Sequence, residues 1–243
     1  MSGHSKWATI KHAKGAADAK RGQMFTKLIK EISIAARMGG GSLDGNPRLR
    51  TAILKARAAN MPKDNIDRAV KKGTGELEGV NYEELIYEAY APGGVAIFIE
   101  VLTDNKNRAA ADIRNILTRA GGQLATSGSV SRLFKRMGVI TLDGDKYTED
   151  AIMEVAIEGG AEDVAASDGI IEVTSAPEDF ESVLNALTAK EIETMSAEVN
   201  MVADAEVTLD NEATAKALKL IDKLEENEDV QNVYSNLAVP DGY

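Results

Sequence analysis

The sequence contains no cysteine. This absence excludes disulfide bonds, thiol nucleophiles and cysteine-based zinc sites, and it suits a protein of the reducing cytoplasm. No run of 18 apolar residues occurs, so we expect no membrane-spanning helix. The basic N-terminus is not followed by the apolar segment of a secretory signal. Aromatic residues make up only 5% of the chain, so its cores must depend on aliphatic side chains.

Residues typical of catalytic and metal sites are also scarce. The only two histidines, His4 and His12, do not have a spacing that places two metal ligands on one helix face. The chain has neither a P-loop nor a dinucleotide-binding glycine motif, and residues 127–130 lack the serine elbow of hydrolases. The sequence therefore predicts a non-enzyme without metal, cofactor or small-molecule substrate.

Basic residues are concentrated at the N-terminal end. Residues 1–80 hold 16 Lys and Arg against 7 Asp and Glu, whereas residues 81–243 hold 12 against 32. The net charge of −11 therefore conceals one strongly basic and one strongly acidic part. Separation of this size indicates a segment that contacts polyanions. We interpret the many acids after residue 141 as a solvated acidic surface, since they are spread over every predicted element.

Three helices are predicted within the basic part. The first spans about 17–38 and ends at three glycines. The second is capped by Asn46 and runs from Pro47 to about Asn60, and the third follows Pro62 and stops at Gly73. On a helical wheel the first helix has one apolar side, and Lys20, Lys27, Lys30 and Arg37 lie opposite it. Short connections between such helices predict a small three-helix bundle.

We predict that the cations of this bundle contact nucleic-acid phosphates, although a solvated polar face is the alternative interpretation. An N-terminal arm would order on binding and reach further, and its Trp7 could stack on a base or pack on the bundle. The predicted contact residues are Lys6, Trp7, Lys11, Lys14, Lys20, Arg21, Lys27, Lys30, Arg37, Arg48, Arg50, Arg57, Lys63, Lys71 and Lys72.

The remaining chain predicts two α+β domains. Strands at 82–91 and 95–103, a helix at 106–120 and a strand at 130–136 precede a β-α-β-β-α-β series over 139–202, which is the ferredoxin-like order. The final helix and strand, at 211–224 and 230–237, would complete the first of these domains. The predicted fold is thus a multi-domain α and β chain, with the bundle at 1–78, an α+β domain at 79–137 plus 206–243, and an inserted ferredoxin-like acidic domain at 138–205.

A secondary anion site is predicted where a strand meets a helix. Asn105, Lys106 and Arg108 lie at the predicted helix N-terminus, where free backbone N–H groups and the helix dipole favour anions. The alternative is a plain N-cap with surface charges. Further along, Arg132, Lys135 and Arg136 extend the basic surface or line an edge strand.

Several motifs resemble the YebC/PmpR family, whose relatives include the mitochondrial translational activator of cytochrome oxidase subunit one. They are GHSKWATIKHAKGAADAKRG at 3–22, NMPKDNIDRAVKKGTG at 60–75, YEAYAPGGVA at 87–96 and LTDNKNRAAADIRNIL at 102–117. Ala91 and Ala13 depart from the pattern, and Ala13 weakens the charge of the arm. The resemblance implies three domains, and either a transcriptional regulator that binds promoter DNA or a ribosome-associated translation factor that binds rRNA and assists synthesis of proline-rich sequences.

The residues themselves favour contact with phosphates over reading of bases. The basic faces hold few Asn or Gln side chains of the kind that recognise base edges, and no heptad seam predicts a symmetric dimer. We therefore expect a monomer that regulates gene expression by binding nucleic acid, with promoter DNA and rRNA both open as targets. A protein-interaction scaffold is the third possibility, but it leaves the basic bundle unexplained.

Overall fold

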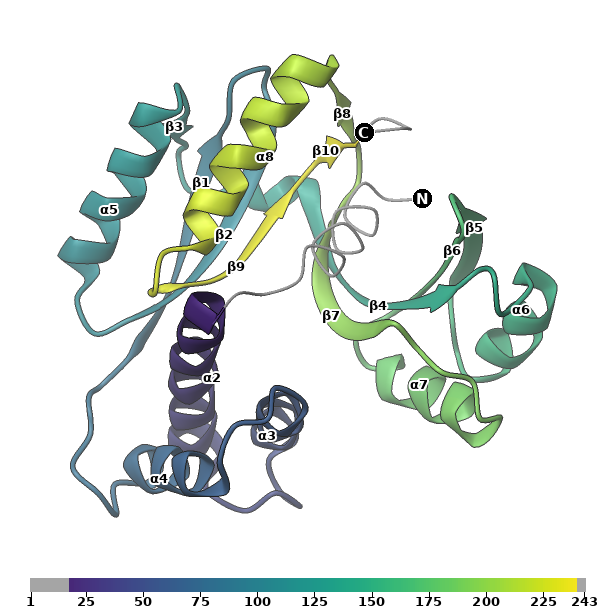
Figure 1. The fold of residues 1–243 in the computed structure, drawn as a ribbon, viewed down its shortest axis with the longest axis horizontal. Helices are drawn as coiled ribbons and strands as arrows, with labels where there is room; N and C mark the ends of the chain where they lie inside the picture. Colours follow the sequence, from purple (N-terminus) through teal and green to yellow (C-terminus); the bar gives the residue numbers. More distant parts are fainter. Residues whose placement is uncertain (1–17, 240–243) are drawn as a thin grey trace.

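The structure is a computed structural model that describes residues 18–239, with side chains from residue 21 onward. Three units are visible in Figure 1: a bundle of three helices, a sheet covered by two helices, and a second sheet with two helices of its own. We call them the bundle, the middle unit and the acidic unit. Within the described residues, none of the helices has both the length and the hydropathy needed to cross a membrane.

The bundle consists of α2 (Asp18–Gly39), α3 (Pro47–Ala58) and α4 (Lys63–Thr74). As predicted, Asn46 caps α3: its side chain accepts a hydrogen bond from the backbone N–H of Leu49. One apolar cluster holds the three helices together, and it includes Ile32, Leu49 and Ile66. Each helix contributes one face to this cluster and leaves its polar face outside.

The predicted stop of the third helix at Gly73 is wrong. The helix α4 continues to Thr74, and Gly75, with a φ of 83°, ends it in the left-handed conformation. Gly73 serves a different purpose, because a Cβ there would lie 2.3 Å from the carbonyl oxygen of Ser33. The glycine therefore allows α4 to cross α2 at close range.

The middle unit is built on a four-stranded sheet in the order β3-β1-β2-β9. The pairings among these strands are antiparallel, and Gly93 and Gly94, both with positive φ, turn the chain between β1 and β2. Two helices and a short parallel pair of strands complete the unit. The bounds are β1 Glu83–Tyr90, β2 Ala96–Thr103, α5 Lys106–Arg119, β3 Gln123–Leu124, β8 Val207–Thr208, α8 Asn211–Glu225, β9 Val230–Ser235 and β10 Leu237–Ala238.

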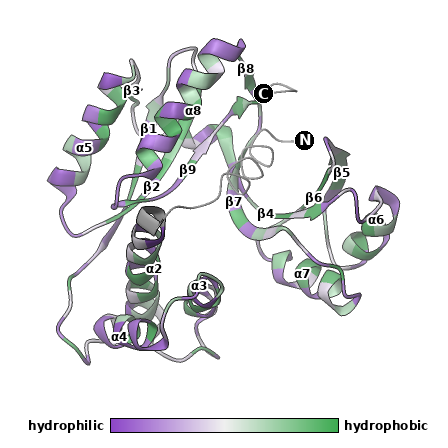
Figure 2. Cartoon of the chain, viewed as in Figure 1, coloured by the Kyte–Doolittle hydropathy of each residue, from purple (hydrophilic) through white to green (hydrophobic). Residues whose placement is uncertain are grey.

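The core of the middle unit joins segments that are far apart in the sequence. The apolar residues of β1 and β2 pack with those of α5, α8 and β9, as the green faces in Figure 2 show. Ile97, Ile99 and Ile113 are fully buried there beside Leu220 and Val230. The C-terminal helix and strand therefore complete the core that residues 85–117 begin.

The acidic unit follows the predicted β-α-β-β-α-β order. Its strands form an antiparallel sheet in the order β5-β6-β4-β7, and residues 134–203 hold 4 Lys and Arg against 16 Asp and Glu. The two helices pack together on one side of it, with Leu187 and Ile152 fully buried. The bounds are β4 Phe134–Asp143, α6 Glu149–Glu158, β5 Asp163–Ser167, β6 Ile170–Ser175, α7 Phe180–Ala189 and β7 Ser196–Ala203.

The separate strand predicted at 130–136 is wrong. Residues Ser131–Leu133 form a 3₁₀ turn, and Phe134–Asp143 is one continuous strand inside the sheet. Gly138, within this strand, makes room for a neighbour, since a Cβ there would lie 2.8 Å from Cδ2 of Phe180. Lys135 and Arg136 consequently do not line an edge strand. A boundary between 137 and 138 would cut through β4, and the division into three domains stays a prediction.

An aromatic cluster joins the acidic unit to the middle unit. Phe134, at the start of β4, packs against Phe98 of β2, and the two ring centroids are 6.1 Å apart. Tyr234 of β9 lies on the same cluster, 6.3 Å from Phe98. This cluster lies on residues of β2 and β9 that the α5–α8 core does not use. It anchors the root of the long β4–β7 pair to the middle sheet.

Candidate nucleic-acid interface

An open groove of about 770 Å³ lies between α3 and α4. Its apolar part includes Ile53, Met61 and Ile66, each at most 6% exposed. Two acids, Asp67 and Glu76, also line it. Three cations lie along it, all with exposed side chains: Arg57, Lys63 and Lys71. We call this feature the α3–α4 groove.

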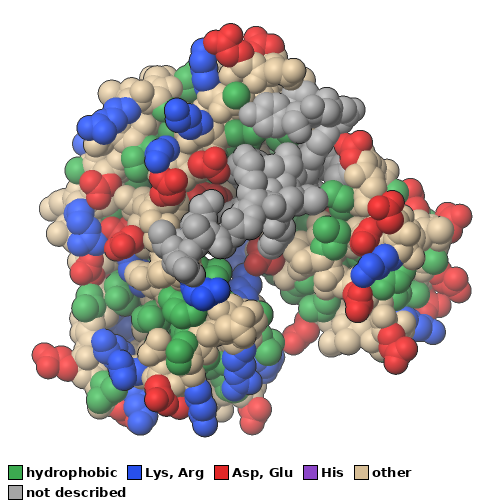
Figure 3. All heavy atoms as spheres, in the orientation of Figure 1, with side chains coloured by type: hydrophobic (Ala, Val, Ile, Leu, Met, Phe, Trp, Pro, Cys, Tyr) green, Lys and Arg blue, Asp and Glu red, His purple; other side chains and the backbone are tan. Residues whose placement is uncertain are grey.

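The groove belongs to a wider cationic surface of the bundle. Six Lys and Arg residues there are exposed, and none of their side chains makes a hydrogen bond or ion pair with another residue in the described part of the chain. Figure 3 shows blue side chains gathered over the lower part of the bundle. Arg68 was not among the predicted contacts, although its outward position on the third helix was apparent. The six residues are Arg37, Arg57, Lys63, Arg68, Lys71 and Lys72.

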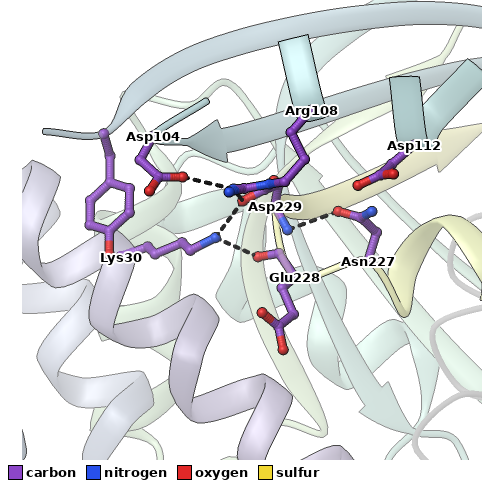
Figure 4. A pocket seen from close by; sticks show the side chains of 8 residues that line it. Lys30, Asp104, Arg108, Asp112, Asn227, Glu228 and Asp229 are labelled. Carbon is purple, nitrogen blue, oxygen red and sulfur yellow. Dashed lines mark hydrogen bonds and ion pairs between the residues drawn. The ribbon is translucent and has the colours of Figure 1, made fainter. Parts of the chain in front are cut away.

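Lys30, in contrast, does not lie on this surface, and its predicted role as a phosphate contact is wrong. The residue is 7% exposed, and its Nζ lies 2.7 Å from Oδ1 of Asp229 and 2.8 Å from the carbonyl oxygen of Glu228 (Figure 4). The ring of Tyr82 is 5.7 Å away on its other side. The helical wheel identified the side of α2 that faces away from the bundle core, but the middle unit covers that side.

Lys27 also faces the middle unit. Its half-buried Nζ donates a hydrogen bond of 2.6 Å to the carbonyl oxygen of Glu225, at the C-terminal end of α8. Gln23 donates to the carbonyl oxygen of Glu226 in the same place. Free carbonyl groups and the negative end of the helix dipole favour a cation there. Lys27 therefore positions α2 against α8.

Most of the remaining predicted contacts on the arm and α2 lie outside the described residues. Arg21 is exposed and interacts within the chain. The side chain of Lys20 lies outside the described residues, as do Lys6, Trp7, Lys11 and Lys14. Their roles stay predictions.

Arg48 is neutralised by two carboxylates. Its Nε and Nη2 donate to Glu31 over 2.7 and 3.1 Å, and Nη2 also donates to Glu84 of β1. The hydrogen bonds with Glu31 raise the pKa of the Arg48 guanidinium above its ordinary value despite burial. Arg48 thus connects α3 with α2 and β1, and we correct its predicted role from phosphate contact to structural link.

The predicted secondary anion site is also wrong, and the plain N-cap is right. Asn105 caps α5 by accepting a hydrogen bond of 3.0 Å from the backbone N–H of Arg108. Lys106 pairs with Glu83 at 2.6 Å. Arg108 pairs with Asp104 at 2.7 Å and with Asp229 at 2.9 Å.

The hollow beside Arg108 is acidic. It measures about 470 Å³, and four carboxylates line it against only two cations (Figure 4). An anion would meet excess negative charge there. Burial alone would raise the pKa of the Asp229 carboxyl, but hydrogen bonds from Lys30 and Arg108 lower it below its ordinary value. The lining residues are Lys30, Tyr82, Asp104, Arg108, Asp112, Asn227, Glu228 and Asp229.

Arg50 and a lysine that was not predicted, Lys55, face the acidic unit. Arg50 donates to the carbonyl oxygen of Leu43 at 3.0 Å and lies 3.6 Å from Glu181 of α7. The Nζ of Lys55 lies 2.7 Å from Glu198 of β7. Lys55 lies on the same predicted helix as Arg50 and Arg57, which was the signal available in the sequence.

The described residues contain no group of three or more His, Asp or Glu side chains placed to hold a metal ion. The histidines of the chain, His4 and His12, precede the described part. The arrangement that the described part does offer to a ligand is the α3–α4 groove with its cations.

Comparisons with known proteins agree with the motifs. The family model described as "TACO1/YebC protein N-terminal domain" matches residues 5–76, and the one described as "TACO1/YebC second and third domain" matches residues 82–237. A solved structure titled "Crystal Structure of a Conserved Hypothetical Protein Aq1575 from Aquifex Aeolicus" is similar, with a TM-score of 0.82 and 44% identity over 92% of this chain and 93% of that one.

Curated relatives match over nearly their full lengths. A "probable transcriptional regulatory protein" of Treponema denticola is 67% identical over 100% of this chain and 98% of its own. A protein of the same name from Treponema pallidum is 65% identical over 99% of this chain and 98% of its own. These matches confirm the resemblance that the sequence motifs predicted. The chain belongs to the TACO1/YebC family.

Proposed function

We propose that this protein is a non-enzymatic regulator of gene expression that binds nucleic acid through the bundle. The observation that carries the proposal is the α3–α4 groove, along which three exposed cations lie without side-chain partners in the described part of the chain. Cations on the side of the bundle that faces the middle unit are neutralised by carboxylates or carbonyl groups, as with Lys30 and Arg48. The three groove cations are therefore available to phosphates.

Promoter DNA is the first candidate ligand. The relatives from Treponema are named probable transcriptional regulatory proteins, and this name supports a role in transcription. Lys and Arg side chains bind phosphates of any sequence, whereas specific recognition needs side chains directed at base edges. We therefore expect the bundle to contribute most of the affinity and little of the sequence preference.

The shape of the α3–α4 groove favours a second candidate, folded RNA such as rRNA. Leu43, which is 36% exposed, and the half-buried Val70 give the groove accessible apolar surface, and an unstacked base can pack on such a surface. A duplex presents its bases only as edges within its grooves. In this alternative the protein acts as a ribosome-associated translation factor.

The proposal is tested by titrating duplex DNA and a folded RNA with the protein at several salt concentrations. Replacing Lys63 and Lys71 with Gln should weaken binding of both ligands and lower the slope of log affinity against log salt by about 1.8 for duplex DNA. The matched control replaces Lys190 and Lys219, which are exposed cations outside the bundle, with Gln. An unchanged slope in the Lys63/Lys71 variant would reject the α3–α4 groove as the binding surface.

The two candidate ligands are separated by crosslinking in cells, followed by sequencing of the recovered nucleic acid. Discrete promoter fragments that disappear in the Lys63/Lys71 variant would support transcriptional regulation. Clustered rRNA sites that disappear in the same variant would support the translation factor. Recovery of neither would leave the scaffold interpretation, in which the bundle binds protein.

A further inference from the structure

The bundle and the acidic unit are connected by two ion pairs. The Nζ of Lys55 lies 2.7 Å from Oε1 of Glu198, and Nη2 of Arg50 lies 3.6 Å from Oε1 of Glu181. Both cations come from α3, and the two acids come from β7 and from the first turn of α7. A basic helix therefore meets carboxylates of the same chain.

This contact is polar and weak. The side chains of Lys55 and Glu198 are 47% and 45% exposed, and that of Glu181 is 69% exposed. Exposed pairs of this kind contribute little to stability and are screened by salt. The apolar clusters of the bundle and of the acidic unit are separate, so neither core spans the contact. Figure 3 shows the surface hollowed between the two units.

The other attachment of the acidic unit lies elsewhere. Phe134 and the aromatic cluster fix the start of β4 and the end of β7 to the middle sheet. Glu181 lies on α7, away from this attachment (Figure 1). A small movement of the unit about its root would separate both ion pairs without disturbing either core. Among the described residues, the side-chain ion pairs between α3 and the acidic unit are these two exposed ones, and such pairs cost little to separate.

Arg50 also continues the cationic surface of the groove. It precedes Arg57 by seven positions, which is nearly two helical turns, so both side chains leave the same side of α3. Lys55 leaves another side of α3, but its side chain and that of Arg50 both reach carboxylates of the acidic unit. We propose that Arg50 and Lys55 form a second polyanion-binding surface of α3, and that Glu181 and Glu198 occupy the places that phosphates take when nucleic acid binds. This inference rests on the proposed function and extends it to a site that the acidic unit covers.

The acidic unit then acts as an internal competitor. Each binding event must separate the two ion pairs, so the apparent affinity is lower than that of the uncovered α3 by the fraction of molecules that are open. Ligands with many phosphates can replace both carboxylates together. A single small anion gains only one contact, so the covered surface favours long polyanions.

The first test removes the competitor without touching the bundle. Replacing Glu181 and Glu198 with Gln should tighten binding of a duplex or single-stranded oligonucleotide by about two- to fivefold at low salt. The control replaces Glu154 and Glu158, exposed acids of α6, with Gln, which alters the net charge equally. Equal affinity of the two variants would overturn the inference and leave the proposed function intact. Absence of binding by all proteins would overturn both.

The second test observes the movement directly, and the absence of native cysteine makes it simple. Spin labels at Ala58→Cys on α3 and Asn185→Cys on α7, both exposed positions, report the distance between the two units. Saturating oligonucleotide should lengthen that distance, as should the Glu181→Gln/Glu198→Gln variant alone. An unchanged distance in the presence of bound oligonucleotide would show that α3 stays covered, and would overturn the inference.

Discussion

Lys30 of α2 and Asp229, the residue before β9, form a buried ion pair with Nζ and Oδ1 2.7 Å apart. Their side chains are 8% and 5% exposed, and 199 positions separate them in the sequence. Arg108 binds the same carboxylate from α5. One aspartate therefore connects the bundle, the helix layer and the last strands of the middle unit.

Replacing Asp229 with Ala should destabilise the protein by about 3 kcal/mol, because it leaves the buried Lys30 ammonium without its carboxylate. Urea unfolding at pH 7 measures this loss. The control is Asp222→Ala on the exposed side of α8, which alters the charge equally and should cost less than about 0.5 kcal/mol. Similar losses in the two variants would mean that the Lys30–Asp229 pair does not hold the units together.

The same ion pair predicts how Lys30 differs from Lys63 in binding assays. Lys30→Met should lower the free energy of unfolding by about 2 kcal/mol, since Asp229 keeps Arg108 as its partner, and should leave the salt dependence of nucleic-acid binding unchanged. Lys63→Met should leave stability within about 0.5 kcal/mol and reduce the salt slope by about 0.9. The opposite pattern would show that the bundle binds through the face of α2.

Glu88 should make the free energy of unfolding depend on pH in the acidic range. Its nearly buried carboxylate accepts hydrogen bonds from the backbone N–H groups of Gly128, Val130 and Ser131. Burial would raise its pKa, but these bonds outweigh burial and lower it. A lowered pKa in the folded state stabilises the protein above the unfolded value of about 4.3, and this stabilisation disappears as the pH falls through the folded pKa.

Glu88→Gln should therefore lower the free energy of unfolding by about 2 kcal/mol at pH 7. The amide oxygen of Gln accepts hydrogen bonds less strongly than a carboxylate, and the NH₂ group of Gln would face a backbone N–H donor. The loss should begin to shrink as the pH falls below the unfolded pKa of about 4.3, and it should continue to shrink as the pH falls through the lowered pKa of the folded Glu88 carboxyl. Thermal unfolding between pH 3 and 7 would follow the difference. The exposed Glu178→Gln serves as the control, and a loss for Glu88→Gln that is the same at every pH would contradict the assignment.

Two glycines of the bundle should respond oppositely to alanine. Gly73→Ala should destabilise the protein by about 2 kcal/mol or more, because its Cβ would meet the carbonyl oxygen of Ser33 and the Cβ of Ala36. Gly22, within α2, has no atom of the described residues within 4 Å of an added Cβ, so Gly22→Ala should stabilise the protein by about 0.5–1 kcal/mol. Calorimetric melting of both variants measures the difference, and stabilisation by Gly73→Ala would reject the close crossing of α2 and α4.

Local signals predicted most elements correctly. Asn46 before a proline placed the start of α3, and Asn105 placed the start of α5, because helix caps depend on residues within one turn. The predicted end of the third helix was wrong because the glycine there is required by a residue far away in the sequence. Gly73 was predicted to end the third helix, but it lies within α4 and lets the backbone of Ser33 approach closely.

The candidate site was harder to predict for the same reason. Periodicity shows which side of α2 faces away from its own bundle, but it does not show that Asp229 lies on that side. Lys30 and Arg108 consequently looked available, although long-range pairing neutralises them. Lys63 and Lys71 were predicted correctly as exposed because α4 has no second unit against its outer face in the described residues.

The positions of the core residues along the chain determine the order in which the three units can fold during synthesis. The bundle has all its core residues once Val70 is made, and the acidic unit once Ala197 is made, whereas the middle core also needs Val233 and Val239. Domains generally fold as their sequences emerge from the ribosome. A nascent chain therefore carries folded basic and acidic units while Ile97 and Ile99 still await α8 and β9, and during that interval their bare sheet face is a surface for chaperones or for aggregation.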